Sequence, residues 1–155
     1  NAPCEVHCLD WLSAQADEVR RAIRSTGSTA PLRLLELYCG GGCNTVALAR
    51  FFDEVIAVEI NRALVDAAEH NLRANGVKNV RLVRSPSAKA DGHTADIAAV
   101  LVDPPRAGLD AQTLGYIEGF DHMFYISCNP VALCRDLQLL TRHEVCSFAI
   151  FDMFP

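Results

Sequence analysis

Short apolar stretches alternate with helical stretches along most of the chain, and this alternation limits the fold more than any other feature. Several of the apolar stretches carry no polar alternation, which is typical of parallel strands that are buried on both faces. The six predicted strands are "RLLELY", "EVIAVEI", "NVRLV", "DIAAVLVDPP", "HMFYIS" and "VCSFAIFDMF". We therefore predict an α/β fold of the Rossmann-like type, with a six-stranded parallel sheet flanked by helices.

The stretches between the strands have helical spacing. Residues from about Glu5 to Ile23 repeat apolar positions at three and four residues. Further helices are predicted from Val46 to Phe51, from Arg62 to Ala74 and from Ala111 to Glu118. Asn75-Gly76 is expected to end the second of these, and Asn129-Pro130 is expected to begin a last helix.

The composition indicates one globular domain of 155 residues, half of them hydrophobic. The sequence has no apolar run of membrane-spanning length and no signal-peptide pattern, so we expect a cytoplasmic or otherwise intracellular monomer. Seven cysteines are an odd number and are interpreted as reduced thiols. No histidine pair accompanies them at ligand spacing, so no metal site is predicted.

The net charge of −5 gives no electrostatic basis for holding nucleic acid. If RNA is the substrate, other segments or a local patch must bind its phosphates. The chain begins at Asn1 rather than Met, and it stops at Pro155 directly after a predicted strand. The crossover from Arg84 to Asp96 is short and contains a poor helix sequence. These features predict that residues 1–155 are a single domain from a longer polypeptide, with sequence lacking in the crossover as well.

Three glycines, Gly40 to Gly42, follow the first strand in "YCGGGCN". Glycines at a strand-to-helix turn let the backbone approach a ligand. The spacing does not match a dinucleotide-binding loop, and no Walker lysine follows. A ligand-binding turn and a bare turn both remain open on this pattern alone.

Glu59 ends the second strand, about 20 residues after the glycine turn, where an acid can accept hydrogen bonds from ribose hydroxyls. The alternative is a solvent-exposed carboxylate at a strand end. An acid placed for a ribose, without a phosphate-binding loop beside it, indicates a nucleoside cofactor that lacks phosphates. S-adenosylmethionine is such a cofactor.

Asp103 ends the fourth strand, and Pro104-Pro105 then stiffen the backbone. Methyltransferases that act on adenine or guanine amino groups usually have an aromatic residue where this chain has Arg106, so amino-group methylation is not favoured. The alternative is a simple proline turn at a strand end.

Cys128 follows the fifth strand and precedes a predicted helix start, which would favour a thiolate. A buried, inert thiol is the alternative. A nucleophilic cysteine beside a methyl donor suits methylation at carbon 5 of a pyrimidine. Carbon 5 of uracil is too weak a nucleophile until a thiolate has added at carbon 6.

The sequence resembles the uracil-5 RNA methyltransferases, especially the tRNA type that makes 5-methyluridine in the T-loop. The resemblance lies in "LLELYCGGG", "VIAVEI", "VDPPRAGLD", "YISCNP" and "FDMFP". It implies a methyltransferase catalytic domain with Cys128 as nucleophile. It also implies a set of residues around S-adenosylmethionine, namely Tyr38, Gly40, Gly42, Glu59 and Asp103. Asp103 is implied to lie near the base as well.

The sequence also departs from the family pattern. Cys43 stands where a cofactor-contacting asparagine is usual, with Asn44 next to it. The family's glutamate base and its final antiparallel strand come from residues beyond the "FP" of this chain, and its RNA-binding portion comes before Asn1. An rRNA uracil-5 methyltransferase and an inactive module that binds cofactor and RNA remain as alternatives. A redox thiol protein is disfavoured, since the sequence contains no C-x-x-C motif.

Overall fold

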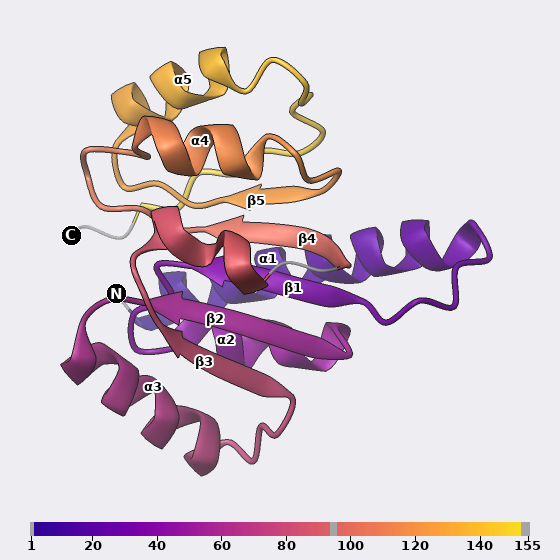
Figure 1. Cartoon of the computed structure of the whole chain (residues 1–155), viewed down its shortest axis with the longest axis vertical. Coiled ribbons are helices and arrows are strands. Elements are labelled where there is room, and N and C mark those ends of the chain that lie inside the picture. Colours follow the sequence, from indigo (N-terminus) through magenta and orange to yellow (C-terminus); the bar gives the residue numbers. More distant parts are fainter. Residues whose placement is uncertain (1, 94–95, 153–155) are drawn as a thin grey trace.

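A five-stranded parallel sheet forms the centre of the molecule in the computed structural model, which describes residues 2–93 and 96–152 (Figure 1). The strand order is β3-β2-β1-β4-β5, and every neighbouring pair is parallel. The strands are β1 (Arg33–Leu37), β2 (Glu54–Glu59), β3 (Val80–Arg84), β4 (Ile97–Val102) and β5 (Met123–Tyr125). Because the strands are parallel, their carboxyl ends all lie at one edge of the sheet, on the left in Figure 1.

Helices cover both faces of the sheet (Figure 1). The face with α1 and α2 buries one apolar cluster, and the face with η2, α4 and α5 buries a second. The helices are α1 (Ala2–Ser25), α2 (Cys43–Leu48), η1 (Ala49–Phe51), α3 (Arg62–Ala74), η2 (Ser87–His93), α4 (Ala111–Ile117) and α5 (Pro130–Leu139). The predicted α/β architecture is confirmed.

The central strand β1 shows why this sequence needs both layers. Successive residues of a strand point to opposite faces, and Leu34 joins the α1 cluster while Leu35 joins the α4 cluster. Leu35 pairs with Ile56 on one side and Val100 on the other, and all three side chains are almost fully buried. Burial on both faces stabilises the sheet mainly through the hydrophobic effect.

The predicted boundaries of α3 and the predicted start of α5 are confirmed by local capping, whereas the helix predicted from Val46 to Phe51 begins earlier, at Cys43, and ends in the separate η1 turn. The side chain of Asn61 accepts hydrogen bonds from the amides of Ala63 and Leu64 at the start of α3. Gly76, with φ of 67°, follows the end of that helix. Asn129 caps α5 in the same way as Asn61, with Pro130 as the first helical residue.

The prediction of a sixth strand from Val145 is wrong for the described residues 145–152, which form no strand. Val145, Phe148 and Ile150 are 59 %, 66 % and 82 % exposed, so among the described residues β5 is left as the edge of the sheet on this side. A strand needs a partner along its length, and β5 extends over only three residues. Phe151 instead packs edge-on against Trp11 of α1, with ring centroids 6.2 Å apart.

Among the described residues of the β3–β4 crossover, the only helical element is the short η2 turn, in agreement with the poor helical sequence there. In the part of the chain that the structure describes, no helix is both long and apolar enough to cross a membrane.

Candidate functional site

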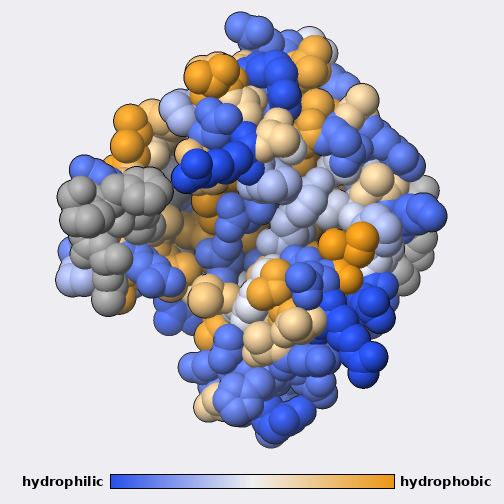
Figure 2. Space-filling model, turned by 90° about the vertical axis from the view of Figure 1, so that its left-hand side faces the viewer, coloured by the Kyte–Doolittle hydropathy of each residue, from blue (hydrophilic) through white to orange (hydrophobic). Residues whose placement is uncertain are grey.

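The carboxyl edge of the sheet carries all of the site residues predicted from the sequence. This edge faces the viewer in Figure 2, where hydrophilic and near-neutral residues surround a hollow near the centre. The first part of the edge is the glycine turn after β1. Gly40 and Gly42 have φ of 55° and 83°, a region that favours glycine.

Gly42 also brings α2 and α3 together. A Cβ atom at Gly42 would lie 3.3 Å from Cβ of Ala68, so a side chain there would crowd α3. Asn71 of α3 donates a hydrogen bond to the carbonyl of Gly41 at 2.9 Å. The turn is therefore held in place by its packing against α3.

Glu59 is buried at the end of β2 and holds the glycine turn from the other side. Its Oε2 accepts a hydrogen bond from the amide of Gly40 at 3.1 Å, and its Oε1 accepts one from the amide of Asn61 at 2.8 Å. A carboxylate has about four acceptor positions, so roughly two remain for a ligand. Glu59 is not the solvent-exposed carboxylate that was the alternative interpretation.

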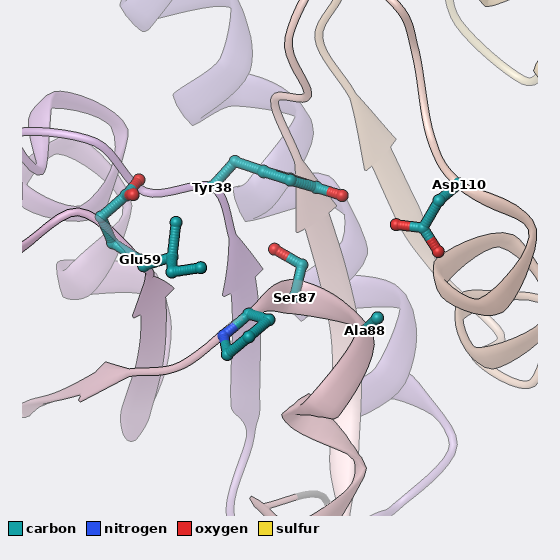
Figure 3. A pocket seen from close by; sticks show the side chains of 7 residues that line it. Tyr38, Glu59, Ser87, Ala88 and Asp110 are labelled. Atoms are coloured by element: carbon teal, nitrogen blue, oxygen red, sulfur yellow. The ribbon is translucent and has the colours of Figure 1, made fainter.

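A cavity of about 200 Å³ lies next to Glu59. Its lining comprises Tyr38, Glu59, Ile60, Pro86, Ser87, Ala88 and Asp110. Figure 3 shows the Tyr38 side chain extended across the cavity between Glu59 and Asp110, with the Ser87 hydroxyl on the η2 side.

Tyr38 reaches this cavity because of an unusual backbone conformation. Its φ is 62°, which is uncommon for a residue other than glycine. In a regular strand Tyr38 would point away from the face that Leu37 occupies, yet both pack against the α4 cluster. The left-handed conformation thus turns the aromatic ring toward the cavity, and such strain is often found at functional sites.

Glu36 is a site residue that the sequence analysis missed. It is 1 % exposed at the fourth of the five positions of β1, and neither carboxyl oxygen has a partner at hydrogen-bond geometry among the described residues. Burial raises the pKa of Glu36 to about 8; the neighbouring Thr45 hydroxyl opposes this rise and the nearby Asp103 adds to it. A carboxylate inside the apolar run "LLEL" was the signal that could have revealed it.

Asp103 lies beside this buried acid at the end of β4. Burial raises its pKa, and a hydrogen bond with the side chain of Asn44 opposes the rise. Asn44 at the start of α2 is thus a neighbour of Asp103, and Cys43 is exposed. The first turns of α1 approach the same edge. The pKa of Cys8 in α1 is raised mainly by burial, next by Cys4, and then by the charge of Asp103.

Cys128 is exposed in the loop between β5 and α5, so it is not the buried thiol of the alternative interpretation. The loop is braced on both sides of the cysteine. Ser127 Oγ accepts a hydrogen bond from the amide of Asn129 at 3.1 Å and donates one to the Asn129 carbonyl at 3.0 Å. The side-chain amide of Asn129 donates to the carbonyl of Arg106 at 2.8 Å. This last bond ties the Cys128 loop to the loop that begins at Asp103.

The structure thus brings the predicted residues to one edge in two groups. Tyr38 and Glu59 line the cavity, while Asp103 and Cys128 lie on adjoining loops. Sequence reasoning missed the cavity wall formed by residues 86–88, because that crossover has no recognisable pattern. All seven cysteines are free, and the described part of the chain contains no group of three or more side chains suited to hold a metal.

Comparison with known proteins places this architecture in a family. The model of the tRNA (Uracil-5-)-methyltransferase family matches residues 15–91 and 90–155. The tRNA/tmRNA (uracil-C(5))-methyltransferase of Edwardsiella ictaluri is 40% identical over all of this chain and 44% of its own length. The protein of the same name from Nitratiruptor is 42% identical over 79% of this chain and 39% of its own length. The chain spans less than half the length of these relatives.

The family match divides inside the crossover, at residues 90 and 91. The alignment with the Edwardsiella protein covers 172 positions, against the 155 residues of this chain.

Solved structures support the same fold. The tRNA (uracil-54, C5)-methyltransferase of Pyrococcus abyssi, solved with S-adenosyl-L-homocysteine, is 26% identical with a TM-score of 0.63, over 81% of this chain and 31% of that one. An rRNA methylase from Streptococcus thermophilus shares the fold with a TM-score of 0.58 at 15% identity, over 70% of this chain and 69% of that one. On the family match and the identity with its relatives, the chain belongs to the tRNA (uracil-5-)-methyltransferase family.

Proposed function

We propose that residues 1–155 form the catalytic domain of a longer RNA (uracil-5-)-methyltransferase, whose substrate is the T-loop uridine of tRNA. The observation that carries this proposal is the bond between Asn129 and Arg106, which holds the loop of an exposed cysteine beside Asp103. Family membership supports the reaction class. The difference in length from the relatives supports the assignment as one domain of a larger protein.

The residues around the glycine turn fit S-adenosylmethionine, which carries a sulfonium and an ammonium group. Glu59 and Asp103 place two carboxyl groups at the same edge of the sheet, next to the buried Glu36. A cluster of acids suits a cationic ligand. Tyr38, Gly40, Gly42, Glu59 and Asp103 are proposed to surround the cofactor, with Glu59 accepting hydrogen bonds from its ribose hydroxyls.

Cys128 is proposed to act as the nucleophile. Its thiolate adds to carbon 6 of the uracil, and the electron pair of the 5,6 double bond becomes available at carbon 5. The cofactor, when bound, supplies the methyl group that carbon 5 takes up. A base then removes the carbon-5 proton, the double bond re-forms, and Cys128 leaves as a thiolate. We expect this base, a glutamate in the family, to lie beyond Pro155.

The test is methyl transfer by the longer polypeptide to tRNA and, separately, to tmRNA and rRNA. Cys128→Ser should give neither product nor a covalent RNA adduct, because a hydroxyl is a far poorer nucleophile than a thiolate. Cys134→Ser, which changes another exposed cysteine at α5, is the matched control and should keep the wild-type rate.

The outcomes separate the alternatives. Transfer to rRNA but not tRNA would contradict the T-loop assignment, and product from Cys128→Ser would contradict the covalent mechanism. Residues 1–155 alone should bind S-adenosylmethionine weakly and turn over no RNA. Turnover by these residues alone would show that they already contain the base.

A further inference from the structure

Asp136 of α5 is a fully buried carboxylate that lies outside every role assigned above. It accepts hydrogen bonds from the amide of Leu109 at 2.8 Å and from the hydroxyl of Tyr125 at 2.6 Å. It also accepts bonds from Nε and Nη2 of Arg135, at 2.8 Å and 2.6 Å. The same Nη2 donates to the carbonyl of Ala107 at 2.9 Å.

These bonds connect three separate segments of the chain. Ala107 and Leu109 belong to the loop that begins at Asp103, Tyr125 is the last residue of β5, and Arg135 belongs to α5. The fit is close, since a Cβ atom at Gly108 would lie 2.6 Å from Oδ2 of Asp136 and 2.5 Å from Nη2 of Arg135. The loop therefore sits directly on the carboxylate.

Two of the connected segments, β5 and α5, flank Cys128 in the sequence. The cysteine lies three residues after Tyr125 and two before Pro130, the first residue of α5, so both ends of its loop are attached to elements that Asp136 holds. The bond from Asn129 to Arg106 already attaches the N-cap residue of α5 to the Asp103 loop, and the Asp136 bonds add contacts from within α5 and from β5. Through Asp136 the elements on both sides of the Cys128 loop are bonded to the Asp103 loop.

We propose that Asp136 is a positioning residue, which holds the loop of Cys128 in register with the loop of Asp103. The inference rests on the proposed role of Cys128 as nucleophile. Hydrogen bonds to a carboxylate fix an angle as well as a distance, and a misplacement of about 1 Å can cost on the order of a hundredfold in rate.

The first test measures the thiol of Cys128 directly in the 155-residue chain. Iodoacetamide alkylation of Cys128 is compared by peptide mass spectrometry with that of the exposed Cys146, in the folded and the urea-unfolded protein. Asp136→Asn places an amide opposite the Leu109 and Arg135 donors, so the loop should loosen. The ratio of the alkylation rate of Cys128 to that of Cys146 should then move toward the ratio measured in the urea-unfolded protein, while the variant itself stays folded.

Two further variants keep the test decisive. Tyr125→Phe removes only the tether to β5 and should change the ratio in the same direction, so it decides the matter if Asp136→Asn does not fold. Asp53→Asn is the control, because Asp53 also accepts bonds from an amide and an arginine, but at the opposite edge of the sheet. It should leave the ratio unchanged.

The second test uses the longer polypeptide and separates kcat from KM. Asp136→Asn should lower kcat by about tenfold or more and change the affinity for S-adenosylmethionine much less, because six of the seven residues that line the cavity, all except Asp110, lie outside the loop that Asp136 holds. A wild-type alkylation ratio in folded Asp136→Asn and Tyr125→Phe would overturn the inference. Product from Cys128→Ser would instead overturn the proposed function, and the alkylation result would still decide the role of Asp136.

Discussion

Replacing Glu36 with glutamine is expected to stabilise the fold, and to do so increasingly as the pH rises. Glu36 is buried without a partner, so the folded protein keeps its carboxyl protonated up to a pKa of about 8, against an ordinary value of 4.5. Glutamine has nearly the same shape and no proton to lose. The two proteins should therefore be similar in stability at the acidic end of this interval and differ at the basic end.

The sign and size follow from proton linkage. Between 4.5 and about 8 the folded wild type binds a proton that the unfolded chain has released, so its free energy of unfolding falls as the pH rises. The fall is at most about 1.4 kcal/mol per pH unit, and at most about 5 kcal/mol over the whole interval. Above that interval Glu36 is ionised in both states and adds no further slope.

Urea unfolding of the 155-residue chain, followed by Trp11 fluorescence at intervals across this pH range, measures the effect. Glu18→Gln, an exposed position on α1, controls for the loss of one carboxylate at the surface. A Glu36→Gln difference that is the same at both ends of the interval would refute the claim that Glu36 is protonated in the fold.

Three further changes test other parts of the site. Glu59→Ala should weaken S-adenosylmethionine binding by about 1–3 kcal/mol in calorimetry, because ribose hydroxyls and the Gly40 amide lose their acceptor; unchanged affinity in the folded variant would exclude Glu59 from the cofactor site. Gly42→Ala should lower the free energy of unfolding more than Gly76→Ala does. Both glycines have positive φ, but only at Gly42 would the new Cβ atom lie 3.3 Å from Cβ of Ala68. Equal losses would mean that Ala68 moves away without cost. Asp136 should stabilise the fold above an ordinary pKa of 3.8 and lose that contribution as the pH falls through its lower folded value. Burial alone would raise this pKa, but the bonds from Leu109, Tyr125 and Arg135 outweigh the effect of burial. The unfolding free energy should therefore fall more steeply with decreasing pH in the wild type than in Asp136→Asn, and an identical pH dependence of the two proteins would argue against this role of Asp136.

The elements that could be predicted from the sequence are those encoded locally. Apolar runs specified β1 to β5, and capping residues such as Asn61 and Asn129 specified where helices begin. The stretch from Val145 has equally high strand propensity, yet it forms no strand because propensity does not supply a neighbouring strand. The sixth strand is therefore missing from the described residues because of its tertiary context and not because of its strand propensity.

The candidate site divides in the same way. Residues at strand ends, such as Glu59 and Cys128, could be found because parallel strands present their carboxyl ends together. The left-handed backbone of Tyr38 has no sequence signature, and neither does the packing that brings Ser87 to the cavity. Glu36 could have been found from its chemistry alone, as a carboxylate in a strand with no place for a charge.

The strand order determines the sequence in which the site residues lie along the edge of the sheet. The cavity lies over the ends of β2 and β1, Asp103 follows β4, and Cys128 follows β5, so these sites occur in order along one edge. Neighbouring strands are roughly 4.8 Å apart, which puts the end of β1 and the end of β5 about 10 Å apart. A nucleoside cofactor over β1 and a base over β5 would then meet above β4, where Asp103 lies. Burial raises the pKa of Asp103, and its carboxyl group would there face both the cationic methyl donor and the uracil.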